Sequence, residues 1–155
     1  MDIYRIAQEK YADDLSGNGA WLYGGRWNSE GFYAVYAASS RSLALLEVLA
    51  HTPSKMLREK EYFLITLSIH LNAPPLKIEQ SQLQTGWDAP DIRLFTQKAG
   101  DQFLTDQNNL LLSVPSVIMP EENNFLINPN HTDMKKVKIS FKRRISFDNR
   151  ISENL

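Results

Sequence analysis

The chain reads FYAVYAASSRSLALLEVLAH over residues 32–51, and this run joins a strand pattern to a helix pattern. Residues 32–37 are rich in aromatic and β-branched side chains, which predicts a strand. Ser39 or Ser40 then offers an N-cap for an apolar helix from about Arg41 to His51, which Thr52 and the proline after it should end. The run therefore predicts that strands and helices pack together in one fold.

Outside this run, further strands are expected at residues 3–6, 61–71, 110–114 and 136–147, with a second helix over about 90–104. Residues 18–25 carry several aromatics and glycines and are interpreted as a loop. Prolines and asparagines in residues 115–129 exclude a long regular element there. Strands dominate and two helices are interspersed, so the prediction is an α+β architecture. Because no repeat or linker divides the chain, residues 1–155 are expected to form a single domain.

The composition bounds the class of function. The chain has 17 lysines and arginines against 18 aspartates and glutamates, so no overall field attracts nucleic acid or an anionic membrane. A basic cluster over residues 135–144 alternates with apolar residues, which favours the solvated side of a strand over a nucleic-acid patch. We therefore expect no direct nucleic-acid binding.

Location and metal content follow from absences in the sequence. There is no cysteine, and no apolar stretch approaches the ~20 residues that a membrane helix needs. The N-terminus has no secretory pattern, so the expected location is the cytoplasm, without membrane association. The three histidines, His51, His70 and His131, lie in separate segments and predict no metal site.

Glu47 is the only charge on the apolar helix between Ser42 and Ala50. Apolar residues surround the helix, which predicts that it is largely buried. A carboxylate there is costly unless it is paired or lines a cavity. One interpretation is a partly exposed glutamate, or one paired with an arginine for structure. The other is a preorganised carboxylate that stabilises a cationic transition state or holds a sugar hydroxyl.

Arg26 and Tyr36 are two further candidates. Arg26 follows Gly24 and Gly25, so a flexible turn presents a bidentate cation suited to a diphosphate or a carboxylate. Stacking of Arg26 on Trp27 is an equally good interpretation. Tyr36 should face away from its strand neighbours; its ring could stack on a flat ligand, although a buried core tyrosine is commoner.

A polar loop pattern follows the strand expected at residues 110–114. Ser116 and Asn128 belong to it, together with the Glu-Glu-Asn-Asn run of residues 121–124. Loops of this kind often bind ligands. Turn formation by Asn128 and Pro129 explains part of the pattern without any ligand.

Taken together, these motifs resemble the signature of RES-domain toxins over residues 4–150. The matching blocks are residues 24–28, 35–38, 46–47 with His51, 96–97 with 100–101, 114–116, 120–123, 127–129 with His131, and 147–150. Arg26, Glu47 and Ser116 correspond to the Arg, Glu and Ser for which the family is named. Phe103 stands where the family leads us to expect a tryptophan.

The resemblance implies a fold similar to ADP-ribosyltransferase toxins, with mixed short sheets around an NAD cleft. It implies that NAD is a substrate rather than a cofactor, and that its nicotinamide N-glycosidic bond is cleaved. Arg26 would grip a polar part of NAD, Tyr36 would stack near the nicotinamide, and Glu47 would support the ribose. Ser116 and Asn128 would contribute to substrate binding.

The biological role implied is a toxin that depletes cellular NAD and is neutralised by an Xre-type helix-turn-helix antitoxin. Water, phosphate or a protein side chain could each act as acceptor, so ADP-ribosyl transfer to a cellular protein is an alternative. A non-catalytic module that binds NAD or the antitoxin is a further alternative, which intact Arg26, Tyr36 and Glu47 disfavour.

Overall fold

Seven strands and five α-helices make up the computed structural model, which describes residues 1–91 and 93–154. The strands are β1 (Asp2–Gln8), β2 (Val35–Ala38), β3 (Tyr62–Ile69), β4 (Leu76–Lys77), β5 (Leu111–Pro115), β6 (Asn123–Ile127) and β7 (Val137–Ile145). The helices are α1 (Asn18–Tyr23), α2 (Arg41–His51), α3 (Ser54–Glu59), α4 (Leu94–Asp106) and α5 (Asn149–Ser152). The α+β class predicted from the sequence is thus confirmed.

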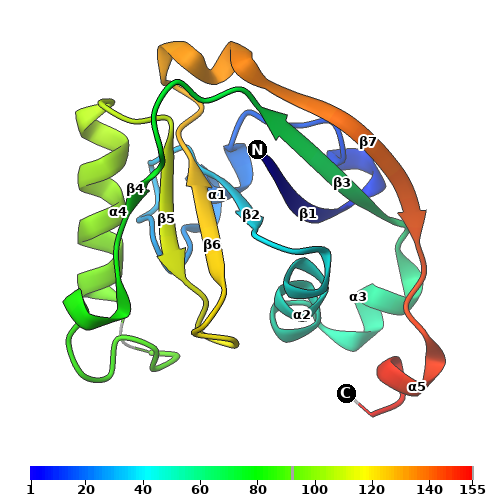
Figure 1. Ribbon diagram of the computed structural model, residues 1–155. Helices are drawn as coiled ribbons and strands as arrows, with labels where there is room; N and C mark the ends of the chain where they lie inside the picture. The colour runs from blue at the N-terminus through cyan, green and yellow to red at the C-terminus, as the bar shows by residue number, and fades with distance from the viewer. Residues whose placement is uncertain (92, 155) are drawn as a thin grey trace.

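The strands form one sheet in the order β4-β5-β6-β2-β1-β3-β7, and only the β4–β5 pairing is parallel. β1 and β2 meet at a single register pair, Tyr4 with Ala38. The sheet therefore divides into two halves that diverge beyond this narrow join (Figure 1). The mixed short sheets that the resemblance implied are joined here into one sheet.

Most elements lie where the sequence pattern predicts them. The strands expected at residues 3–6, 32–37, 61–71, 110–114 and 136–147 correspond to β1, β2, β3, β5 and β7, and α2 has the expected bounds. The helix expected from residue 90 begins later, at Leu94.

Several elements were not predicted: α3, α5 and the short strand β4 lie outside the expected helices and strands, and two segments interpreted as irregular contain regular structure. Residues 18–25 are not a loop throughout: α1 occupies Asn18–Tyr23, between Gly17 and Gly24, which both have positive φ. Residues 115–129 contain β6, whose Phe125, Leu126 and Ile127 are buried between β5 and β2. A buried run of three residues among polar neighbours is too short for periodicity to reveal.

Packing positions the two helices that matter for function. On α2 only Leu43 and Ala44 are buried, against Ala38, so the prediction of a largely buried helix is wrong. The rest of α2 is half-buried or exposed, and Glu47 is one of its half-buried residues. α4 lies against the β5–β6 half, where Phe103 and Leu104 join the core.

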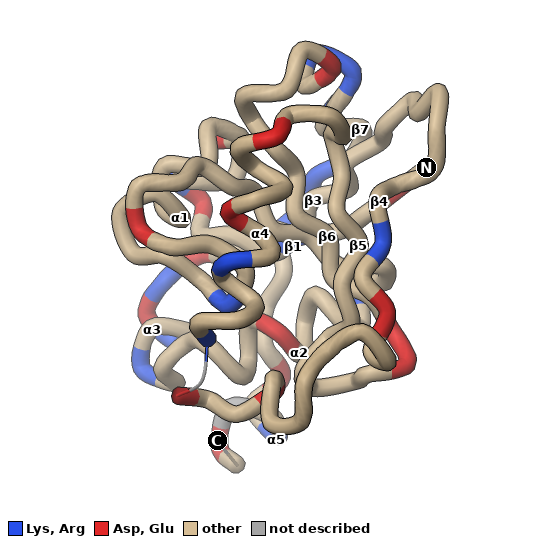
Figure 2. The backbone as a smooth tube through the Cα atoms, turned by 90° about the vertical axis from the view of Figure 1, so that its left-hand side faces the viewer, with Lys and Arg blue, Asp and Glu red and all other residues tan. Residues whose placement is uncertain are grey.

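Charges of both signs are interspersed along the backbone (Figure 2). The basic cluster lies mainly on β7, an edge strand, where Arg144 pairs with Glu9 and Glu61, and Lys142 pairs with Asp13. These pairs agree with a solvated strand face. Within the described residues, no helix is long and apolar enough to cross a membrane.

Candidate active site around Glu47

A hydrogen bond connects the start of α2 to the residue that precedes β6. Ser40 caps the helix by accepting the Leu43 N–H at 3.0 Å, as predicted for one of the two serines, and its hydroxyl donates to Glu122 Oε2 at 2.8 Å. Ala38, at the end of β2, pairs with Asn124 of β6. Because α2 follows β2 directly, this register places the helix beside the first residues of β6.

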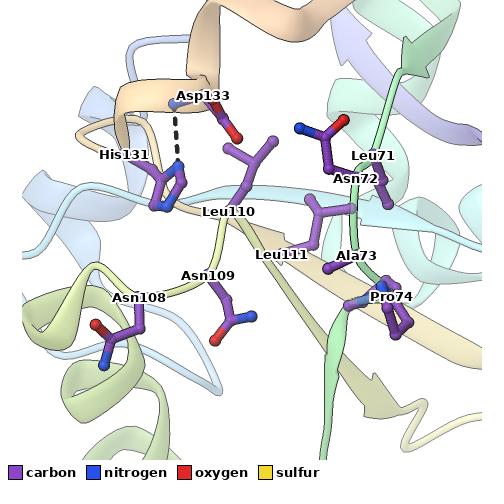
Figure 3. A pocket seen from close by; sticks show the side chains of 11 residues that line it. Leu71, Asn72, Ala73, Pro74, Asn108, Asn109, Leu110, Leu111, His131 and Asp133 are labelled. Carbon is purple, nitrogen blue, oxygen red and sulfur yellow. Dashed lines mark hydrogen bonds between the residues drawn. The ribbon is translucent and has the colours of Figure 1, made fainter.

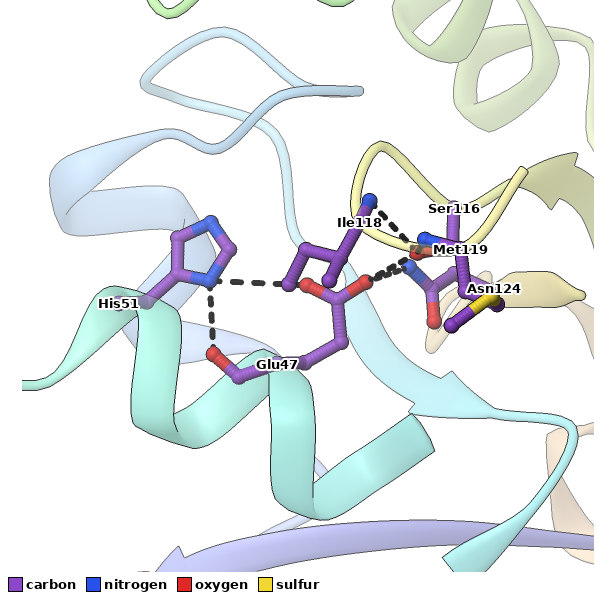
Figure 4. A network of polar contacts seen from close by, with 6 residues as sticks. All are labelled: Glu47, His51, Ser116, Ile118, Met119 and Asn124. Carbon is purple, nitrogen blue, oxygen red and sulfur yellow. Dashed lines mark hydrogen bonds and ion pairs between the residues drawn. The ribbon is translucent and has the colours of Figure 1, made fainter. Parts of the chain in front are cut away.

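The Glu47 carboxylate is held by two donors from this neighbouring region (Figure 4). Glu47 Oε1 accepts the Ser116 hydroxyl at 2.9 Å and the Asn124 side-chain amide at 2.5 Å. His51, one turn along α2, has Nδ1 2.8 Å from the Glu47 carbonyl and 3.5 Å from Oε2. The Glu47 side chain is 23% exposed. A carboxylate that is oriented by neutral donors and partly exposed can stabilise positive charge that develops on a bound ligand.

Ser116 lies behind Glu47. It is fully buried, and its hydroxyl also accepts the N–H groups of Ile118 and Met119, both at 3.1 Å. The role in substrate binding that the resemblance implied for Ser116 stays a prediction. The hydroxyl fixes the turn after β5 and orients the Glu47 carboxylate.

Arg26 lies in a tight turn in which Gly25 and Asn28 pair across an isolated bridge. Its Nη1 donates to the carbonyls of Trp87 at 2.9 Å and Ala89 at 3.1 Å. Nε and Nη2 make no hydrogen bond to the described residues, so a second edge of the guanidinium is available for a ligand. Trp27 is buried against Trp87, and the described residues show no stacking of Arg26 on it.

The electrostatic setting of Arg26 connects it with Glu47. Burial lowers the pKa of Arg26, as does Arg93, whereas Asp88 and Glu47 act in the opposite direction. An arginine remains charged through the physiological range despite such a shift. Glu47 is thus one of the charges that act on the pKa of Arg26, although 21 positions separate the two residues in the sequence.

Tyr36 follows the predicted alternation. Val35 and Ala37 belong to the core between the sheet halves, while Tyr36 packs on the opposite side, toward Trp27. Its hydroxyl accepts the Trp27 N–H at 3.1 Å and donates to Asn28 Oδ1 at 2.7 Å. Burial raises the pKa of Tyr36, so the phenol stays protonated and is no general base near neutral pH.

Asn128 is not brought to this site. It is fully buried at the other end of β6 from Asn124, with Nδ2 donating to the Leu104 carbonyl and Oδ1 accepting the Asn130 N–H. Substrate binding by Asn128 stays a prediction, and the structure gives the residue a role in the fold. The residue holds the turn after β6, which is the structural interpretation of the Asn-Pro pair.

Sequence reasoning missed two neighbours of Glu47. Asn124 was part of the polar run at residues 121–124, but no local pattern indicated that it would reach Glu47. His51 lies four residues after Glu47 on α2, a spacing that places two side chains on one face of a helix. That spacing was visible in the sequence and could have identified the contact.

Two hollows lie away from these residues. A cavity of about 100 Å³ is lined by Leu71, Asn109 and His131 among others (Figure 3), and a second of about 280 Å³ by Gln8 and Lys60 among others. Neither is lined by Glu47. The candidate site is identified by its charge and hydrogen bonding. No cluster of three or more potential metal ligands occurs in the part of the chain that the structure describes.

Comparison with known proteins agrees with this picture. The model of the RES domain family matches residues 2–148. A protein of Sphingobium sp. (strain YBL2) named "Prs ADP-ribosylating toxin" is 43% identical over 153 residues, covering 96% of this chain and 95% of its own length. A "Toxin Res" of Yersinia enterocolitica is 39% identical, covering 84% of this chain and 86% of its own length.

A solved structure supports the fold. The fold matches a chain in the crystal structure of the M. tuberculosis MbcT–MbcA toxin–antitoxin complex, with a TM-score of 0.78 and 23% sequence identity. The match covers 99% of this chain and 87% of the other. At this identity the likeness concerns the arrangement of the elements.

Proposed function

This chain belongs to the RES domain family, and we propose on that basis that it is a toxin that breaks the bond between nicotinamide and ribose in NAD. In the hydrolytic form of the reaction, water adds to C1′ of the ribose as the C1′–N bond breaks. Nicotinamide leaves with the bonding electron pair, and the water proton passes to solvent. The products are nicotinamide and ADP-ribose.

The observation that carries the proposal is the orientation of the Glu47 carboxylate. As the glycosidic bond lengthens, positive charge develops on the ribose ring. A carboxylate whose Oε1 is already held by Ser116 and Asn124 needs no reorganisation to stabilise that charge. Glu47 would therefore act mainly on the rate of bond cleavage.

Arg26 supplies the complementary binding function. The free edge of its guanidinium can bind an NAD phosphate in bidentate fashion, while Nη1 stays on the loop carbonyls. The Tyr36 hydroxyl is engaged with Trp27 and Asn28, so a contact with nicotinamide would use the ring alone.

ADP-ribosyl transfer to a protein is the second candidate, and the name of the Sphingobium relative, "Prs ADP-ribosylating toxin", favours it. Water, phosphate and a side chain would attack the same cationic C1′. Cleavage of the nicotinamide bond is common to all three, and the proposed roles of Arg26 and Glu47 do not depend on the acceptor.

An antitoxin partner completes the proposal. The solved relative of similar fold was crystallised as a toxin–antitoxin complex, which supports an antitoxin for this chain, and we propose one of the Xre helix-turn-helix type. A toxin that consumes NAD in the cytoplasm would arrest growth unless such a protein covered its site.

The test is incubation of purified, antitoxin-free protein with NAD, followed by chromatography for nicotinamide. Three parallel reactions distinguish the acceptors by their products. Water in plain buffer gives ADP-ribose, added phosphate gives the phosphate ester of ADP-ribose, and a protein acceptor in cell extract gives ADP-ribosylated protein. We expect nicotinamide in at least one reaction, and release that is ~10²-fold to 10³-fold slower with Glu47→Gln. Intact NAD in all three with folded protein would support the non-catalytic alternative and refute the enzyme.

A further inference from the structure

Gln97, Gly100 and Asp101, which the proposed reaction leaves without a role, lie on the side of α4 that faces the Arg26 turn. Gln97 Nε2 donates to the Gly25 carbonyl at 2.9 Å and to the Asn28 carbonyl at 3.3 Å. Asp101, one turn later, accepts the Ser29 N–H at 2.8 Å and the Ser29 hydroxyl at 2.6 Å. Two side chains of one helix thus hold both sides of the segment that carries Arg26.

Gly100 brings α4 and this turn into direct contact. A Cβ at position 100 would lie 1.6 Å from the Trp27 carbonyl oxygen, so only glycine allows the observed approach. Glycine weakens a helix interior, and here close packing against the backbone next to Arg26 explains its presence. The contact between Gly100 and Trp27 lies between those of Gln97 and Asp101.

The turn is also held from inside. The fully buried Asn28 donates to the carbonyls of Ala20, Ser29 and Phe32, and its Oδ1 accepts the Tyr36 hydroxyl. The backbone on both sides of Arg26 therefore has few degrees of freedom. Together with the two carbonyls that Nη1 contacts, this leaves one edge of the guanidinium to face a ligand.

We infer that Gln97 and Asp101 are positioning residues for Arg26, which they orient through the backbone of residues 25–29. The inference rests on the proposed function, because it assigns Arg26 to the binding of an NAD phosphate. Displacement of a bidentate cation by about 1 Å can lower the efficiency of a reaction ~100-fold. Loss of either positioning residue should then raise KM for NAD more than it lowers kcat, since Glu47 is held by other elements.

The test compares Gln97→Met with Gln102→Met. Both substitutions remove an amide of similar size from α4, but Gln102 is exposed, and among the described residues its side chain donates a hydrogen bond to Asp106. We expect KM for NAD to rise at least about 10-fold in Gln97→Met and to stay at the wild-type value in Gln102→Met. Asp101→Asn, which can still accept the Ser29 N–H, should show a smaller rise.

A double-mutant cycle with Arg26→Lys separates positioning from general destabilisation. If Gln97 acts through Arg26, Gln97→Met should change KM little in the Arg26→Lys background. The inference would be overturned if the two substitutions raised KM by independent factors that multiply in the double mutant. It would also be overturned if kcat fell as much as KM rose and both followed the thermal midpoint. Either result would leave the proposed function intact.

Residue-resolved amide hydrogen exchange tests the same claim without NAD. The N–H groups of Gly25, Trp27 and Ser29 are bonded to Asn28, Tyr36 and Asp101. Their protection should fall at least about 10-fold in Gln97→Met and not in Gln102→Met. Unchanged protection in Gln97→Met would refute positioning whether or not the wild-type protein consumes NAD, whereas an inactive wild type would refute only the proposed function.

Discussion

Replacement of Glu47 by glutamine should nearly abolish nicotinamide release while leaving the protein folded. The amide keeps the size of the side chain, and its oxygen can still accept from Ser116 and Asn124. The negative charge is lost. A unit charge ~4 Å from a developing cation is worth about 4 kcal/mol at an effective dielectric constant of ~20. Loss of one such contact typically slows turnover ~10²-fold to 10³-fold, which is about 2.7 to 4 kcal/mol.

The stability of Glu47→Gln should change little. Two hydrogen bonds to a carboxylate become two to a neutral amide, which costs up to ~1 kcal/mol each, but removal of a charge from a half-buried position offsets part of this cost. With the side chain 23% exposed, we expect a net change within about 1 kcal/mol, or ~4 °C in thermal midpoint for a chain of this size.

The assay measures turnover and thermal midpoint on the same preparation. Glu121→Gln removes the same charge from an exposed position of the neighbouring loop and should leave both quantities at wild-type values. Full activity of Glu47→Gln with a clearly lowered midpoint would show that the carboxylate is structural, and would refute the reasoning.

Three further predictions follow from packing and protonation. Gly100→Ala should destabilise the protein by ~1 to 3 kcal/mol in thermal unfolding, because its Cβ meets the Trp27 carbonyl, whereas Gly19→Ala has open space and should be neutral or stabilising; equal midpoints would contradict the packing. Ser116→Ala should lower kcat about 10-fold and preserve KM for NAD, because Glu47 loses one of the donors that orient it. It should also lower the unfolding free energy by ~1 to 3 kcal/mol in a denaturant titration, because two backbone N–H groups lose their acceptor. A change in KM alone would oppose the assigned role. Because the pKa of Tyr36 is raised in the folded state, its contribution to stability is complete below the unfolded pKa of ~10 and is lost as pH rises above that value. Tyr36→Phe should therefore flatten the fall in unfolding free energy between pH 9 and 11. Identical slopes for the two proteins would refute this.

Local pattern was sufficient for the elements that form the frame of the site. Ser40 caps α2 as predicted, and the alternation in β2 places Tyr36 on the side opposite Val35 and Ala37. Glu47 stood out because a single charge on an apolar helix needs a reason, even though α2 is less buried than its sequence suggested. These properties depend on neighbours within one or two turns, which a sequence displays directly.

Only the tertiary structure decided which side chains meet Glu47 and Arg26. Ser116 and Asn124 are 69 and 77 positions from Glu47, and Gln97 is 72 positions from Gly25. The insertion of β6 between β5 and β2 produces the first two contacts, and the close approach that Gly100 allows produces the third. The same insertion and pairing removed Asn128 from the site and buried Ser116. Strand order is chosen by burial summed over the whole chain, so no local periodicity encodes it, whereas α2 and its single carboxylate were determined by the sequence alone.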